Sequence, residues 1–75
     1  MHKVEILLKG NTKQTDRLYN KIVKEADASQ FLGRFSTLEE KNTADGYYMK
    51  FVATQEVYEL LSTLEEKGKV EFVYN

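Results

Sequence analysis

The chain has 75 residues and no cysteine, and its 11 basic and 12 acidic side chains leave a formal net charge of −1. A chain of this length builds one hydrophobic core, so we expect a single domain over residues 1–75. The lack of cysteine excludes a disulfide framework, a thiolate metal site and a cysteine nucleophile. It also fits a reducing compartment, so we expect a cytoplasmic protein. The longest apolar run is three residues, too short to cross a membrane.

The first predicted element is a strand over residues 3–9, because apolar and polar side chains alternate there with a period of two. Gly10 and Asn11 end this strand. Thr12 or Thr15 is expected to cap the helix that follows. The apolar residues of this helix recur at helical spacing between residues 18 and 26, and residues 27–29 are expected to end it.

The middle of the chain predicts a β-hairpin. Residues 31–38 alternate again and indicate the second strand. The dipeptide at Asp45 and Gly46 predicts a turn, because glycine adopts positive φ without penalty. Residues 47–53 then form the third strand.

The last part of the chain predicts a helix and a strand. Thr54 is expected to cap the helix, and apolar residues at i, i+3, i+4 and i+7 give residues 57–64 the clearest helical stripe in the sequence. Lys67 and Gly68 are typical of a helix C-terminus. Residues 70–74 alternate and predict the last strand.

The element order βαββαβ is that of the ferredoxin-like α+β fold, which predicts a four-stranded antiparallel sheet with two helices on one face. The core expected under the helices comprises Val4, Ile6, Leu8, Phe35, Met49, Phe51, Val70 and Phe72. The opposite sheet face is expected to lack a helix, and its candidate partner-binding residues are Leu7, Lys9, Arg34, Tyr48, Lys50, Val52 and Val73. The second and fourth strands are the expected edges, which a partner strand could extend.

Residue types that carry catalysis or bind metals are scarce in this sequence. The single histidine, His2, lies at the start of the first strand without an evident orienting partner. Adjacent acids such as Glu39 and Glu40 point apart instead of converging on one site. The sequence has no His/Cys cluster and no calcium-loop spacing. We therefore expect a protein that is not an enzyme and that holds no metal and no cofactor.

RNA binding is the first alternative function. Residues 45–52, with the sequence DGYYMKFV, resemble the third strand of RNA-recognition motifs, whose aromatic rings stack on bases. Only the glycine–aromatic step agrees, and Asp45 stands where that motif has a cation. Alternation turns Tyr47 and Phe51 inward, so Tyr48 is the one ring left for stacking, worth about 1–3 kcal/mol. A basic ridge on the first helix is a second surface that could meet phosphates; it comprises Lys13, Arg17, Lys21 and Lys24.

The second half of the chain also resembles subtilisin propeptides and the small proteinase inhibitors related to them. The resemblance lies in residues 46–51, in the helix at residues 57–64 and in residues 69–74. It implies a propeptide-like inhibitor whose chain end enters the cleft of a protease.

A small protein-binding module is the function that the sequence favours. Small size, scarce site chemistry and a sheet face that mixes apolar groups with charges are typical of an inhibitor or regulator of a larger protein, or of a self-associating dimer. The content of Lys, Glu, Asn and Tyr is common in phage and mobile-element proteins. A small-molecule sensor is a further alternative, for which we expect little cavity volume between helices and sheet.

Overall fold

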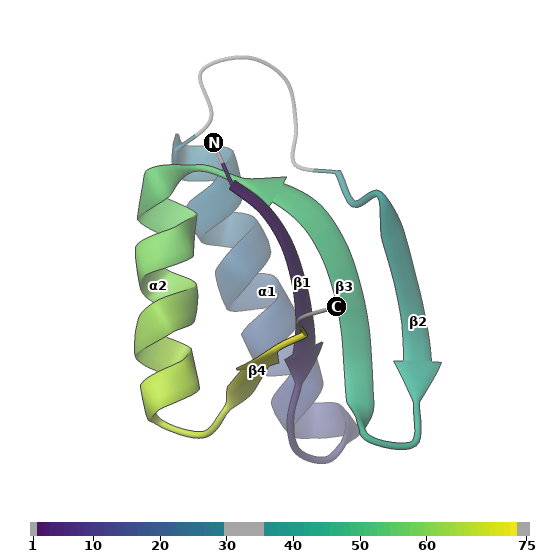
Figure 1. Cartoon of the computed structure of the whole chain (residues 1–75). Helices are drawn as coiled ribbons and strands as arrows, with labels where there is room; N and C mark the ends of the chain where they lie inside the picture. The colour runs from purple at the N-terminus through teal and green to yellow at the C-terminus, as the bar shows by residue number, and fades with distance from the viewer. Residues whose placement is uncertain (1, 30–35, 74–75) are drawn as a thin grey trace.

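The protein is a four-stranded antiparallel sheet with helices packed against it (Figure 1). The computed structural model describes residues 2–29 and 36–73. Its elements are β1 (His2–Leu8), α1 (Thr12–Ser29), β2 (Glu39–Thr43), β3 (Gly46–Ala53), α2 (Gln55–Glu66) and β4 (Val70–Phe72). This element order and the strand order β2-β3-β1-β4 confirm the ferredoxin-like α+β fold, with β2 and β4 at the edges.

The two central strands, β1 and β3, set the core. They pair from His2 opposite Ala53 to Leu8 opposite Tyr47. Because side chains alternate across a strand, one apolar set from each strand meets the apolar stripes of both helices in a single cluster. Its buried members are Val4, Ile6, Leu8, Leu18, Ile22, Ala26, Met49, Phe51, Ala53, Val57, Leu61, Leu64 and Val70.

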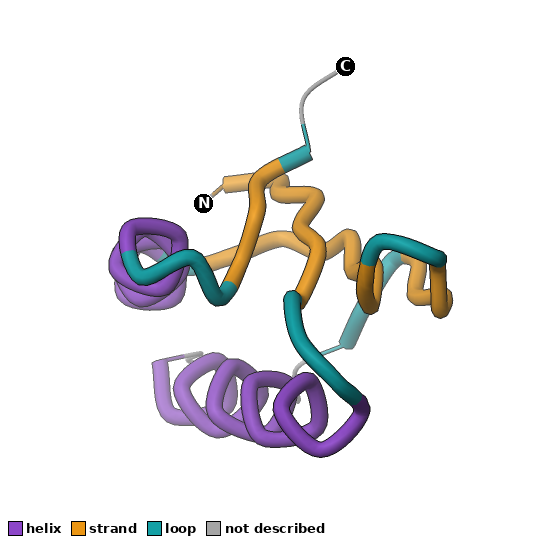
Figure 2. Tube along the Cα trace, turned by 90° about the horizontal axis from the view of Figure 1, so that it is seen from below, coloured by secondary structure: helices purple, strands orange, loops and turns teal. Residues whose placement is uncertain are grey.

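The predicted core is largely confirmed. Six of its members are buried, and Phe72 is half-buried against the cluster. Phe35 lies outside the described residues. Figure 2 shows α1 lying along one side of the sheet, while no helix of the described residues covers the other side. Neither of the helices described has the length and apolar character that crossing a membrane requires.

The cap of α1 differs from the prediction, because Asn11 caps this helix instead of Thr12 or Thr15. Asn11 Oδ1 accepts a hydrogen bond from the Gln14 N–H, and Gln14 Oε1 accepts one from the Asn11 N–H, each at 2.9 Å. This reciprocal pair is a capping box, which satisfies two amide protons that a helix start leaves free. The described helix runs to Ser29, and the residues that follow lie outside the described part of the chain.

Both ends of α2 are confirmed. Thr54 caps the helix with its hydroxyl. At the other end Gly68 has φ of +74°, its N–H donates to Glu65 O at 3.0 Å, and the N–H of Lys69 donates to Leu64 O at 3.0 Å. These two bonds form a Schellman motif. The motif reverses the chain into β4 and returns Lys69 to the side of Leu64.

The second strand lies further along the chain than the alternation predicts. Residues 36–38 are not in a strand, β2 spans Glu39–Thr43, and residues 31–35 lie outside the described residues. All side chains of β2 are exposed, so it carries no apolar alternation. Pairing with β3 holds it in place, with Thr43 opposite Gly46 across a turn at residues 44–45. The predicted hairpin therefore exists, but with a different first strand.

The last strand is shorter than predicted. β4 ends at Phe72, although the N–H of Val73 still donates to Glu5 O at 2.8 Å. Residues 74 and 75 lie outside the described residues.

Candidate functional site

The side of the sheet that no described helix covers is called the open face here. Strand register assigns its side chains: Leu7 lies between Tyr48 of β3 and Glu71 of β4, and Glu5 lies opposite Lys50. The predicted face residues Leu7, Lys9, Tyr48, Lys50, Val52 and Val73 belong to it by this alternation. Arg34 lies outside the described residues.

Three of these residues form what we call the apolar centre of the open face: Leu7, Tyr48 and Val73. Leu7 pairs directly with Tyr48, and the bond from the Val73 N–H to Glu5 O places Val73 diagonally next to Leu7. All three are half-buried. Val52 is 41% exposed but stands apart, because it lies opposite Lys3 near the far end of the same strand pair.

Tyr48 is engaged on both its hydroxyl and its ring. The hydroxyl donates a hydrogen bond to Glu5 Oε1 at 2.5 Å, and this bond raises the pKa of Tyr48 to about 12. The Nζ of Lys41 lies 5.1 Å from the ring centroid, a cation–π distance. These contacts hold the ring in one position and occupy one side of it, which leaves less of it free to stack on a base.

Tyr47 lies on the helix side of the sheet, as alternation predicts. Its ring meets that of Tyr19 on α1 edge to face, with the centroids 5.9 Å apart. A hydrogen bond with Glu40 raises the pKa of Tyr19 to about 12. Burial and then the charge of Glu40 raise the pKa of Tyr47. Tyr47 and the buried Phe51 are therefore held among protein groups and do not extend an aromatic platform onto the open face.

Several charges of the open face are paired within the protein. Lys9 Nζ lies 2.8 Å from Glu71 Oε2, and this hydrogen-bonded pair raises the pKa of Lys9. Lys41 Nζ lies 3.4 Å from Glu39 Oε2. Lys50 stands between two acids in the register, opposite Glu39 on β2 and Glu5 on β1. Opposite charges thus alternate across the strands around the apolar centre.

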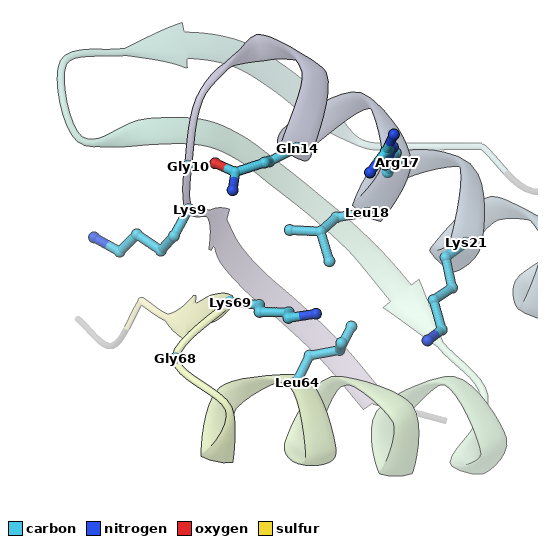
Figure 3. Close-up of a pocket in the computed structure, with 9 residues that line it drawn as sticks. All are labelled: Lys9, Gly10, Gln14, Arg17, Leu18, Lys21, Leu64, Gly68 and Lys69. Atoms are coloured by element: carbon cyan, nitrogen blue, oxygen red, sulfur yellow. The ribbon is translucent and has the colours of Figure 1, made fainter.

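The basic ridge does not act as one unit in the structure. Lys13, Arg17, Lys21 and Lys24 are all exposed on α1, but only Arg17 and Lys21 line a groove between α1 and the turn that joins α2 to β4. The volume of this basic groove, as we call it, is about 530 Å³. Its floor and walls also include Lys9, Leu18, Leu64 and Lys69 (Figure 3).

The basic groove is the feature that the sequence does not reveal. The groove lies at the surface between α1 and the turn after α2, and not between the helices and the sheet, where we expected little cavity volume. Lys9 and Lys69 are sixty positions apart and meet because the N–H of Lys9 donates to Lys69 O at 2.8 Å. The only hint in the sequence is the Gly68–Lys69 step after α2, which turns Lys69 back toward the helices.

His2 has a partner that the sequence does not suggest. Its ring stacks on Tyr58 with the centroids 4.3 Å apart, and its Nε2 lies 2.7 Å from Oε1 of Gln55. These neighbours orient the imidazole, and neither of them is a carboxylate. Within the described residues there is also no group of three or more His, Cys, Asp or Glu side chains placed to hold a metal ion.

Comparison of the chain with protein-family models, with curated proteins and with solved structures finds no match. The case for a function therefore depends on the two surfaces described above.

Proposed function

We propose that this protein is a non-catalytic module that binds another protein through the open face of its sheet. The observation that carries the proposal is the apolar centre, in which Leu7, Tyr48 and Val73 lie together inside a rim of charged side chains. An apolar patch within a polar rim is the usual anatomy of a protein–protein interface. A regulatory or inhibitory role in the cytoplasm is the setting we propose for it.

The contacts of Tyr48 favour a protein partner over RNA. Stacking on RNA needs exposed aromatic faces, whereas Lys41 lies over one face of the Tyr48 ring and the Tyr48 hydroxyl donates a hydrogen bond to Glu5. Lys9 and Lys41 are already paired with Glu71 and Glu39, so a phosphate that approached would compete with these carboxylates for the two cations. A flat protein surface that offers one apolar side chain to Leu7 meets none of these obstacles.

The test compares two leucines in different places. Leu7→Gln removes the middle of the apolar centre, and Leu38→Gln removes a leucine that is 60% exposed and lies outside it. Wild type and both variants are used to capture and cross-link partners from a lysate of the source cells, and the affinity of the recovered protein is then measured. We expect Leu7→Gln to weaken binding about 30-fold, the effect of losing a central interface residue. Leu38→Gln should change it less than about two-fold.

Two results would contradict the proposal that the open face binds a protein. A protein that binds both variants as wild type does would refute the open face as the docking surface, and so would recovery of RNA alone. Sedimentation at two protein concentrations tests whether the chain binds a second copy of itself. A wild-type dimer that Leu7→Gln converts to a monomer would identify a second copy of the chain as the partner on the same face.

A further inference from the structure

The basic groove gathers cations from three separate parts of the chain. Arg17 and Lys21 come from α1, Lys69 comes from the turn after α2, and Lys9 follows β1. In Figure 3 the amino group of Lys69 points into the space between the helices, and Lys21 extends from α1 toward α2. None of the described residues that line the groove is acidic.

Three of these four cations lack a counter-ion in the described part of the chain. Lys9 points away from the middle of the groove and pairs with Glu71 at 2.8 Å. The structure gives no ion pair to Arg17, Lys21 or Lys69 with any described residue. Like charges held around one space repel, so the folded protein favours any anion that enters it.

The floor of the groove is apolar, and this restricts the kind of ligand that fits it. Leu18 and Leu64 belong to the core and are 7% and 2% exposed, so they present a narrow apolar strip at this floor. A groove of about 530 Å³ falls within the range of small-molecule sites. Guanidinium groups bind phosphate oxygens in a bidentate manner, and ammonium groups bind them as point charges. The three cations and the apolar floor of the groove therefore suit a ligand that has several phosphate charges and one apolar portion.

We propose that the basic groove binds a small molecule with two or more phosphate groups, of the nucleoside di- or triphosphate class. Arg17, Lys21 and Lys69 contact the phosphates, and the ring system lies over Leu18 and Leu64. The groove lies between α1 and the turn after α2, and of the open-face residues named above only Lys9 also lines it, so this site does not depend on the protein-binding function. Its failure would leave that proposal standing.

The experiment titrates isotope-labelled protein with ATP, with inorganic pyrophosphate and with adenosine, and follows the amide NMR signals. We expect ATP and pyrophosphate to shift the signals of Arg17, Gly68 and Lys69, and adenosine to shift them little. Both phosphate compounds should bind more weakly as salt is raised, because the contacts are ionic. If pyrophosphate bound as strongly as ATP, the phosphate groups alone would account for the affinity. That result would refute the contact between the ring system and the two leucines.

The basic ridge supplies matched control variants. Lys21→Gln and Lys69→Gln each remove one charged contact and should weaken ATP binding roughly ten-fold. Lys13→Gln and Lys24→Gln remove the same charge from α1 outside the groove and should change it less than about two-fold. Far-UV circular dichroism checks that every variant is folded.

Three outcomes would overturn the site. The first is that millimolar ATP shifts no amide signal, and the second is that all four substitutions weaken ATP binding equally. The third is that an oligonucleotide binds more tightly than ATP and that Lys13→Gln weakens its binding as much as Lys21→Gln does. The last result would assign the whole ridge to a nucleic-acid backbone instead of assigning the groove to a small molecule.

Discussion

Thr54 joins the two helices of this protein through a single hydroxyl. Its Oγ1 accepts a hydrogen bond from the Val57 N–H at 3.3 Å and lies 2.7 Å from Oγ of Ser29, the last residue of α1. Thr54 is also buried, at 9% exposure. Replacing Thr54 by alanine therefore removes the cap of α2 and the link from α2 to the end of α1 in one step.

The size of this effect follows from the two bonds. Loss of an N-cap hydroxyl costs about 1 kcal/mol. Loss of the bond to Ser29 costs about 1 kcal/mol more, because the Ser29 hydroxyl then keeps only its 3.3 Å bond to Ala26 O. Thr54→Ser keeps the hydroxyl and loses one buried methyl group, at a cost of about 0.8 kcal/mol. We expect Thr54→Ala to lower the free energy of unfolding about 2 kcal/mol further than Thr54→Ser does.

Urea unfolding followed by circular dichroism measures this difference. A domain of this size has a total stability of about 4–11 kcal/mol, so about 2 kcal/mol corresponds to a fall in Tm of about 8–16 °C. Ser29→Ala completes a double-mutant cycle, in which we expect a coupling energy of about 1 kcal/mol between the two hydroxyls. If the free energies of unfolding of Thr54→Ala and Thr54→Ser agree within about 0.5 kcal/mol, the hydroxyl does not join the helices. A coupling energy of zero would lead to the same conclusion.

Two further predictions concern the open face and the hairpin. Glu5→Gln should lower the pKa of Tyr48 from about 12 toward its ordinary value, as read from a tyrosine-resolved NMR titration; no change would mean that Glu5 is not the cause. Because this pKa is raised on folding, the stability it contributes is complete below about pH 10 and is lost as the pH rises toward 12. Gly46→Ala should destabilise the protein by about 3 kcal/mol, since Gly46 has φ of +147° and an added Cβ would meet Leu8 O. Gly68→Ala is the control: its φ is +74° but open space surrounds it, so it should cost only about 1 kcal/mol. Equal losses in urea unfolding would refute the backbone clash.

The strands that a sequence pattern can find are those that bury one face. β1 and β3 alternate because their inward side chains enter the core, and the stripe of α2 is visible for the same reason. β2 is different, since Glu39 to Thr43 are all exposed and backbone pairing with β3 is what holds them. No periodicity marks such an edge strand, so the apolar alternation of residues 31–38 misplaces it. A turn at this point is still identifiable from the Asp45–Gly46 dipeptide, although it spans residues 44–45, because glycine adopts the positive φ found at Gly46.

The candidate sites divide in the same way. Alternation alone is enough to place Leu7 and Tyr48 on one face, because it depends only on the parity of strand positions. The basic ridge on α1 groups residues by helical spacing, yet tertiary structure separates Arg17 and Lys21 from the other two. Lys69 joins them through the Schellman turn after α2. Spacing along one helix carries no information about what packs beside that helix.

The two surfaces differ most in how their charges are balanced. On the open face Glu71 pairs with Lys9 and Glu39 with Lys41, so a partner there cannot gain an ion pair at those positions without displacing one that the protein already makes. Exposed pairs of this kind contribute little energy, which leaves Leu7 and its apolar neighbours as the source of affinity. Binding at the open face should therefore depend weakly on salt. In the basic groove Arg17, Lys21 and Lys69 have no described counter-ion, so a ligand there supplies the missing charge. Its affinity must then fall as salt screens that attraction. The salt dependence of any ligand found for this protein thus indicates which of the two surfaces it occupies.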